Sequence, residues 1–120
     1  MVSVRSYRDL VAWQRSVQMS LDVYRVTKDF PKSEVWSLVS QMRRSSVSVP
    51  SNIAEGWGRG GSAEYLRYLK IARGSLFELS TQFEIAKGLG YVVPSDGVLE
   101  QLDECGRILA GLIRAIERRS

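Results

Sequence analysis

The sequence predicts an all-α protein, folded as an antiparallel up-down-up-down four-helix bundle. Apolar residues recur at helical spacing in four segments, at about residues 7–28, 33–56, 63–89 and 98–118. Short stretches rich in turn residues separate these segments, and short connections between long amphipathic helices favour antiparallel neighbours. No alternating apolar and polar run is long enough to require a strand. The length of 120 residues fits a single domain, which we place over residues 1–120.

The first two helices are expected on either side of a proline turn. In the first helix, Leu10, Val17 and Tyr24 repeat every seven residues and form the expected core stripe. The sequence Asp29-Phe30-Pro31 ends this helix, since proline cannot continue it. Ser33 is expected to cap the second helix. The core stripe of the second helix is expected at Val35, Val39, Met42, Ser46, Val49 and Ile53.

A cluster of glycines marks the next turn. Gly56, Gly58, Gly60 and Gly61 are expected to close the second helix because glycine supplies the left-handed conformations of a turn, and Ser62 is expected to cap the third helix. A glycine-rich turn before a helix can also bind phosphate on its backbone N–H groups. The letters G-W-G-R-G-G-S match neither the P-loop nor the dinucleotide fingerprint, and no strand precedes them. A plain turn between helices is therefore the favoured interpretation.

The third helix carries more apolar surface than one partner helix requires. Tyr65, Tyr68, Ile71 and Phe77 widen its apolar face beyond a single stripe. A loop with glycine, proline and an expected capping residue follows, at residues 88–97. The core of the third helix is expected at Leu69, Ala72, Leu76, Leu79, Phe83 and Ala86. The core of the fourth helix is expected at Leu102, Cys105, Leu109, Leu112 and Ile116.

The composition argues against an enzyme. The chain contains no histidine, which removes the commonest general base and the commonest metal ligand. The single cysteine, Cys105, cannot form an internal disulfide, and any transition-metal site would need carboxylates alone. We therefore expect no catalytic centre, no metal and no cofactor. Because Cys105 lies in an apolar helical pattern, we expect a buried, inert thiol in a reducing compartment.

The cellular location follows from targeting signals. Residues 1–8 lack the apolar stretch of a signal peptide, and no segment approaches the roughly 18 apolar residues of a membrane span. We expect a cytoplasmic protein without a membrane partner.

The distribution of charged residues supports binding to nucleic acid. The net charge of +4 is only mildly basic, so its distribution matters more than its size. At the end of an antiparallel bundle where the first and third helices begin, cations outnumber carboxylates. Arg67, Lys70 and Arg73 recur every three residues and form a basic stripe suited to phosphates, although a solvated charged face is an equally ordinary interpretation. The candidate nucleic-acid contacts are Arg5, Arg8, Arg43, Arg44, Arg59, Arg67, Lys70, Arg73, Arg118 and Arg119.

Residues 41–59 form the most distinctive segment, with the letters Q-M-R-R-S-S-V-S-V-P-S-N-I-A-E-G-W-G-R. Together with residues 7–13 and 64–69, this segment resembles the four-helix proteins encoded within intervening sequences of bacterial 23S rRNA genes. That family also includes accessory proteins of diversity-generating retroelements. The resemblance covers roughly residues 7–92. It implies a homopentameric barrel that binds nucleic acid, with a reverse transcriptase or ribosomal RNA as partner, and it supplies no catalytic residue.

Four residues of this segment are assigned as a structural motif: Pro50, Asn52, Glu55 and Gly56. Pro50 removes one backbone hydrogen bond and crowds the Ser46 carbonyl. Asn52 and Glu55 are three residues apart and share a helix face, which favours a polar patch inside or between bundles. We expect Glu55 to pair with a cation from another helix or subunit, in preference to a catalytic role.

Two further features point outward from the bundle. Arg43 and Arg44 are adjacent, so they project about 100 degrees apart on a helix, and at most one of them can lie near the core edge.

Four aromatic residues do not fit the core stripes and are candidates for a subunit interface, with partial cover of the core as the ordinary alternative. These four are Trp36, Trp57, Tyr65 and Tyr68.

The sequence therefore predicts a non-enzymatic, homo-oligomeric bundle, a pentamer as the resemblance implies. Its basic surface is expected to bind RNA or DNA backbones without reading sequence. The alternative is a protein-interaction scaffold that does not bind nucleic acid.

Overall fold

The fold is described from a computed structural model, which describes residues 4–92 and 97–119. Four long helices are present: α1 (Val11–Thr27), α2 (Ser40–Gly58), α3 (Ser62–Gly88) and α4 (Val98–Arg119). The described residues also form three short helical segments before or between them: the 3-10 helices η1 (Tyr7–Asp9) and η2 (Lys32–Glu34), and the π-helix η3 (Val35–Val39). The described residues contain no strand. The predicted all-α class is confirmed.

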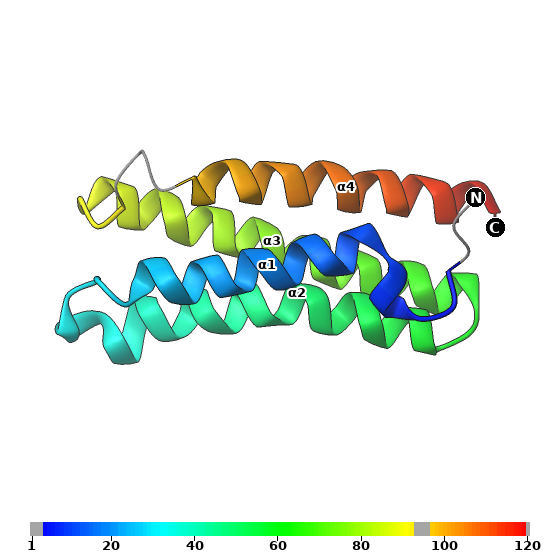
Figure 1. Cartoon of the computed structure of the whole chain (residues 1–120), viewed down its shortest axis with the longest axis horizontal. Coiled ribbons are helices and arrows are strands. Elements are labelled where there is room, and N and C mark those ends of the chain that lie inside the picture. Colours follow the sequence, from blue (N-terminus) through cyan, green and yellow to red (C-terminus); the bar gives the residue numbers. More distant parts are fainter. Residues whose placement is uncertain (1–3, 93–96, 120) are drawn as a thin grey trace.

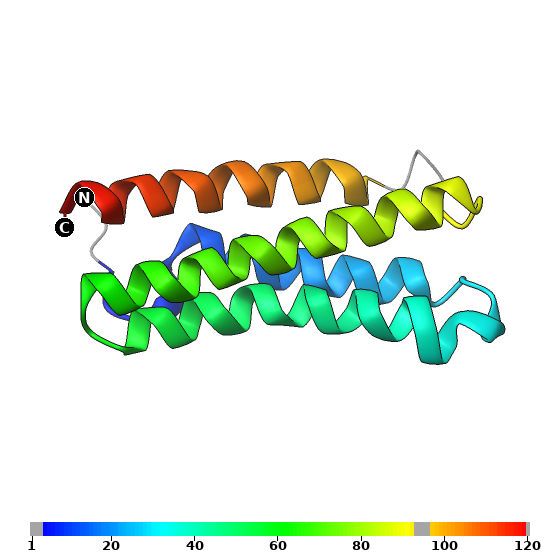
Figure 2. The same ribbon diagram turned by 180° about the vertical axis from the view of Figure 1, so that it is seen from behind.

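The four helices form an elongated bundle of 45 × 26 × 20 Å. Consecutive helices run in opposite directions (Figures 1 and 2), and α1 contacts α4 as well as α2, which closes the bundle. The α2–α3 turn, the start of α1 and the end of α4 lie together at one end, which we call the α2–α3 end. The α1–α2 connection lies at the opposite end, which we call the α1–α2 end.

One cluster of buried side chains runs through all four helices. Every predicted core residue of α3 is buried, and the prediction for α2 is confirmed for all positions except Val35, which is exposed. In α4, Leu102, Cys105, Leu109 and Ile116 are buried as predicted. The prediction of Leu112 is wrong by one residue, because Ile113 occupies the core and Leu112 is only partly buried.

The predicted core face of α1 is wrong. Tyr24 is exposed, and Leu10 and Val17 are only partly buried. The helix instead buries a neighbouring face that contains small and polar residues, so counting apolar residues at heptad spacing selected the wrong stripe. The hydroxyl groups on this face are satisfied locally, since Ser16 donates to the Trp13 carbonyl at 2.9 Å. The buried residues of α1 are Ala12, Ser16, Met19, Ser20, Val23, Val26 and Thr27.

The expected helix caps also differ. Ser33 lies within η2 and begins no α-helix, and α3 starts at Ser62 with Gly61 at the N-cap position and no side-chain capping bond. Gly56 and Gly58 lie inside α2, and the turn itself uses Gly60, whose φ is +88°. Pro94, Ser95 and Asp96 of the predicted α3–α4 loop lie outside the described residues.

Helix α2 continues through Pro50 because a neighbouring helix satisfies the carbonyl that proline leaves free. Pro50 has no N–H to donate to Ser46. The Ser20 hydroxyl of α1 lies 2.8 Å from the Ser46 carbonyl and donates to it. The lost bond within α2 is thereby replaced by a buried contact between α1 and α2.

Helices α2 and α3 approach most closely at Gly56. A Cβ atom at this position would lie 2.7 Å from the Cβ of Tyr68 and 3.2 Å from the backbone oxygen of Tyr65. Gly56 is therefore required for close packing, whereas the sequence suggested only a role in ending the helix. This contact sets the position of the first turns of α3 at the α2–α3 end.

Candidate nucleic-acid interface

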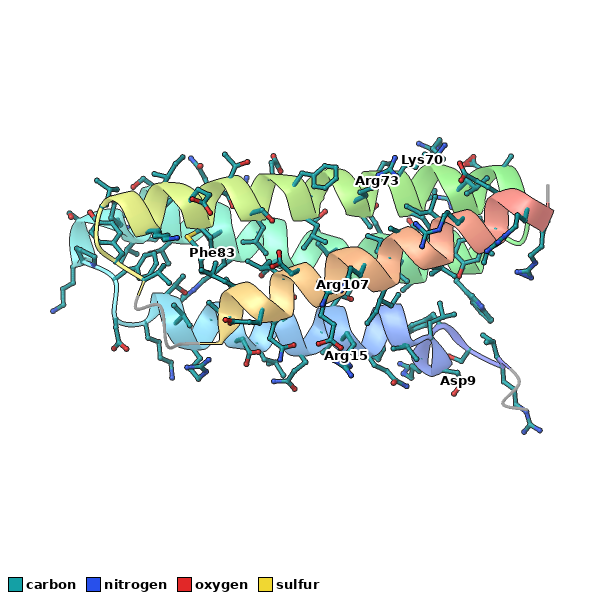
Figure 3. All side chains as sticks on the ribbon, turned by 90° about the horizontal axis from the view of Figure 1, so that it is seen from above. Asp9, Arg15, Lys70, Arg73, Phe83 and Arg107 are labelled. Atoms are coloured by element: carbon teal, nitrogen blue, oxygen red, sulfur yellow. The ribbon has the colours of Figure 1, made fainter. Side chains whose placement is uncertain are left out.

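Cations from three helices meet at the α2–α3 end. Arg59 follows the last residue of α2, Arg67 lies in the second turn of α3, and Arg118 lies in the last turn of α4. Lys70 and Arg73 lie on the outer side of α3 in Figure 3. The antiparallel order of the helices therefore gathers the predicted basic residues from distant parts of the sequence.

Three of these cations are paired with carboxylates. The Arg67 Nε atom lies 2.8 Å from Glu64, the Arg59 Nη2 atom 3.4 Å from Glu55, and the Lys70 Nζ atom 3.6 Å from Glu117. All three pairs are exposed, and such pairs stabilise a fold by only about 0–1 kcal/mol. Because the pairs are this weak, a phosphate can compete for their cations.

The other cations of this end have no ion-pair partner among residues 4–92 and 97–119. The one carboxylate of η1, Asp9, accepts backbone N–H bonds from Arg5 and Ser6, at 2.9 and 3.2 Å. The Asp9 carboxylate belongs to a capping box with Ser6, and it forms no ion pair with a side chain among the described residues. The candidates without an ion pair at this end are Arg5, Arg8, Arg73, Arg118 and Arg119.

Tyr68 organises the arginines at the start of α3. The guanidinium groups of Arg59 and Arg67 lie 5.1 and 4.6 Å from the centre of its ring, and Arg59 also donates to the Tyr68 hydroxyl at 2.8 Å. Tyr65 is half-buried beside it. Burial raises the pKa of the Tyr65 hydroxyl, and the positive charge of Arg119 opposes that rise. The end of α4 therefore lies close enough to act on the start of α3.

The four aromatic interface candidates differ in their surroundings. Tyr65 and Tyr68 contact their own chain as described, and Trp57 lies 6.4 Å from the Tyr7 ring in an edge-on arrangement. Trp36 alone of the four is almost fully exposed, at 92%. Their role between subunits stays a prediction.

Arg43 and Arg44 lie apart from the other candidates, because both belong to the half of α2 near the α1–α2 end. Arg43 is half-buried, and its Nε atom donates to the Thr27 hydroxyl at 2.9 Å. Arg44 is exposed. The prediction that only one of the two lies near the core edge is confirmed.

The structural motif residues lie on α2. Asn52 donates to the Ser48 carbonyl at 2.8 Å and to the Ser48 hydroxyl at 2.9 Å, so its amide is used within the helix. Within the chain, Glu55 pairs with Arg59, four residues along the same segment, and a partner from another subunit stays a prediction. Two partners so close in sequence lie on one helix face, so no second helix is needed.

Comparison with known proteins places the chain among its relatives. The family profile described as 23S rRNA-intervening sequence protein matches residues 8–111. The chain belongs to this family. Comparison with the curated proteins finds no match.

A solved structure shares the fold of this member of the 23S rRNA-intervening sequence family. The crystal structure of a protein of unknown function from the S23 ribosomal protein family of Bacteroides thetaiotaomicron superposes with a TM-score of 0.79 at 19% identity. The match covers 87% of this chain and 96% of that one. At this identity the likeness establishes the bundle fold alone.

The single thiol of the chain belongs to Cys105. Burial raises the pKa of the Cys105 thiol to about 11, so this member of the family carries a protonated, buried thiol at neutral pH. Within the described part of the chain no cluster of acidic or cysteine side chains could hold a metal ion. No described helix is long and apolar enough to cross a membrane.

The structure shows two apolar surfaces, and sequence reasoning missed the first of them. One is a groove between α1 and α2 of about 340 Å³, lined by Val17, Leu21 and Val47 among others. The other lies on α3, where Phe77 is 62% exposed and Ile85 is also exposed. The seven-residue repeat marks a stripe of α1 that is partly buried at Leu10 and Val17 and exposed at Tyr24. The apolar excess predicted on α3 does lie at the surface.

Proposed function

We propose that this family member is a non-enzymatic, homo-oligomeric, cytoplasmic bundle that binds RNA or DNA backbones through the α2–α3 end. The observation that supports the proposal is the meeting of cations from three helices there, with several lacking any carboxylate partner among the described residues. Phosphate contacts of this kind provide affinity without base recognition. A reverse transcriptase or ribosomal RNA is the partner that the family resemblance implies.

The basic stripe on α3 gives the direct test. Combined replacement of Arg67, Lys70 and Arg73 by glutamine removes up to three phosphate contacts. The slope of log affinity against log salt concentration for duplex DNA is then expected to shrink by roughly 2 to 3 units. Fluorescence anisotropy of a labelled duplex over a series of salt concentrations measures this slope.

A matched variant separates position from total charge. Arg25→Gln and Lys87→Gln together remove two positive charges near the α1–α2 end, and this variant is expected to bind more tightly than the pair Arg67→Gln and Lys70→Gln, which removes the same charge from the basic stripe. Equal losses in the two variants, or wild-type binding that does not depend on salt, would contradict the proposal.

Self-association is supported by the two apolar surfaces. The α1–α2 groove and the exposed face of α3 are different patches, and a contact between different patches joins copies head to tail, so that they can close into a ring. Burial of such patches is the usual source of affinity between subunits. We propose a pentamer of 13.5 kDa subunits.

Leu21→Ser on α1 and Phe77→Ser on α3 are each expected to dissociate the assembly, since every interface would use both patches. Light scattering after size exclusion measures the mass. Val11→Ser, an exposed apolar position on another face of α1, is the control and should retain the wild-type mass. A monomeric wild-type protein, or an unchanged mass in both variants, would rule out this arrangement.

The second candidate function is a protein-interaction scaffold. The same apolar surfaces favour it, because exposed apolar patches mark sites of protein association. Gentle purification distinguishes the two, since a scaffold without nucleic-acid affinity should show a protein-only absorbance ratio.

A further inference from the structure

Trp36 lies on η3 at the α1–α2 end and is 92% exposed. An indole ring is a large apolar surface, and folding normally covers most of it. The π-helical turn that carries Trp36 is also unusual, since π-turns are rare and occur often at functional sites. The Trp36 ring is therefore almost unpacked within the single chain.

Beside Trp36 lies a groove of about 570 Å³, between the last turns of α1 and the first turns of η3 and α2. Its size falls in the range of pockets that hold small ligands, roughly 300–1,000 Å³. Four cations line it, and none of its described lining residues is acidic. The four cations are Lys28, Lys32, Arg43 and Arg44.

One of these cations is held in a fixed position by neutral groups. The Arg43 guanidinium lies 4.7 Å from the centre of the Tyr24 ring and donates to the Thr27 hydroxyl at 2.9 Å. A second bond, at 3.4 Å, reaches the Tyr24 carbonyl. These contacts orient Arg43 and leave its charge uncompensated.

The carboxylates of Glu34 and Asp22 contact groups other than the four cations of the groove. Glu34 accepts hydrogen bonds from the Ser37 hydroxyl at 2.6 Å and the Tyr91 hydroxyl at 3.1 Å, and these bonds lower its pKa. Asp22 lies 4.0 Å from Arg25 on α1. Asp29 lies in the connection between α1 and η2, but it does not line the groove. The groove therefore presents positive charge next to a free aromatic face.

We propose that this groove binds single-stranded RNA or DNA, with an unpaired base stacked on Trp36 and adjoining phosphates on Lys28, Lys32 and Arg44. Aromatic rings that stack bases, together with cations that follow the backbone, are the usual elements of single-strand binding. A duplex keeps its bases stacked on each other and cannot offer one to Trp36. An apolar helix would bury the cations without opposing charge, which is costly.

This site is separate from the α2–α3 end, because α1 and α2 span the bundle between them. It adds recognition of unpaired bases, which the backbone contacts at the other end do not provide. Its test therefore does not depend on the basic stripe of α3.

Titration with a short oligothymidylate, followed by intrinsic tryptophan fluorescence and by anisotropy of a labelled strand, tests the site. Stacking should quench Trp36, and the quenching should disappear in Trp36→Phe. Trp36→Ala is expected to lower affinity about tenfold or more, as found for the loss of a stacked base. Trp36→Phe should recover most of this loss because it restores an aromatic face.

Two comparisons make the test specific. Inorganic polyphosphate of matching charge should compete less well than unlabelled oligothymidylate, since it has no base to stack. The glutamine variant of Arg67, Lys70 and Arg73 should retain the Trp36 quenching. Wild-type affinity in Trp36→Ala, or equal competition by polyphosphate, would overturn the proposal. A changed assembly mass in Trp36→Ala would also overturn it, because a second copy of the chain would then be the occupant.

Discussion

Gly56→Ala is expected to destabilise the bundle by about 2 kcal/mol, although alanine is intrinsically the better helix residue by about 1 kcal/mol. The added methyl group would lie 2.7 Å from the Cβ of Tyr68. That atom is attached directly to the backbone, so no rotamer change can move it away and α2 must separate from α3. Thermal unfolding should show a midpoint lower by roughly 5–10 °C.

Gly58→Ala is the matched control. Gly58 also lies in α2, and a Cβ there would meet nothing within 4 Å. Helix propensity then acts alone, and the control is expected to be unchanged or more stable by up to about 1 kcal/mol. If both variants gained stability, the close approach of α2 and α3 at Gly56 would be wrong.

The same variant connects packing with the proposed interface. The guanidinium groups of Arg59 and Arg67 lie 5.1 and 4.6 Å from the centre of the Tyr68 ring. A shift of α3 at Gly56 displaces this ring and the arginines with it. Gly56→Ala should therefore also weaken duplex binding, even under conditions in which the protein is fully folded.

The sequence predicted α3 well because its buried positions are all apolar, so that periodicity and burial coincide. It failed for α1 because that helix buries Ser16 and Ser20, whose hydroxyl groups bond to backbone carbonyls. A polar residue that satisfies itself locally can occupy a core position without an apolar signal. Tyr24, which belongs to the predicted stripe but is exposed, misled the pattern in the opposite direction.

The candidate site was predictable where it depends on topology. Once the helices alternate in direction, Arg59 and Arg118 must meet at one end. Arg43 lies 16 residues before Arg59 on the same predicted helix, so the same reasoning places it toward the opposite end. Trp36 does not fit the predicted core stripes, and it is 92% exposed. The π-turn that carries Trp36 has no recognisable pattern in the sequence.

Phe83→Ala is expected to have the largest effect on stability, a loss of about 3–5 kcal/mol. Phe83 is 1% exposed, and its side chain lies on the side of α3 that faces the other helices (Figure 3). Removing the ring loses its burial and leaves a cavity that close-packed helices fill only in part. Since a domain of this kind has a free energy of unfolding of about 5–15 kcal/mol, the variant should lose a large share of it.

Urea unfolding followed by circular dichroism, at one fixed protein concentration, measures this loss, because association would make stability depend on concentration. Glu84→Ala, at the adjacent exposed position, should change stability by no more than about 0.5 kcal/mol. Phe83→Leu should fall between the two, since leucine refills part of the volume. A Phe83→Ala protein as stable as Glu84→Ala would mean that α3 does not pack with this face toward the core, and the exposed position of Phe77 on the same helix would then also be wrong.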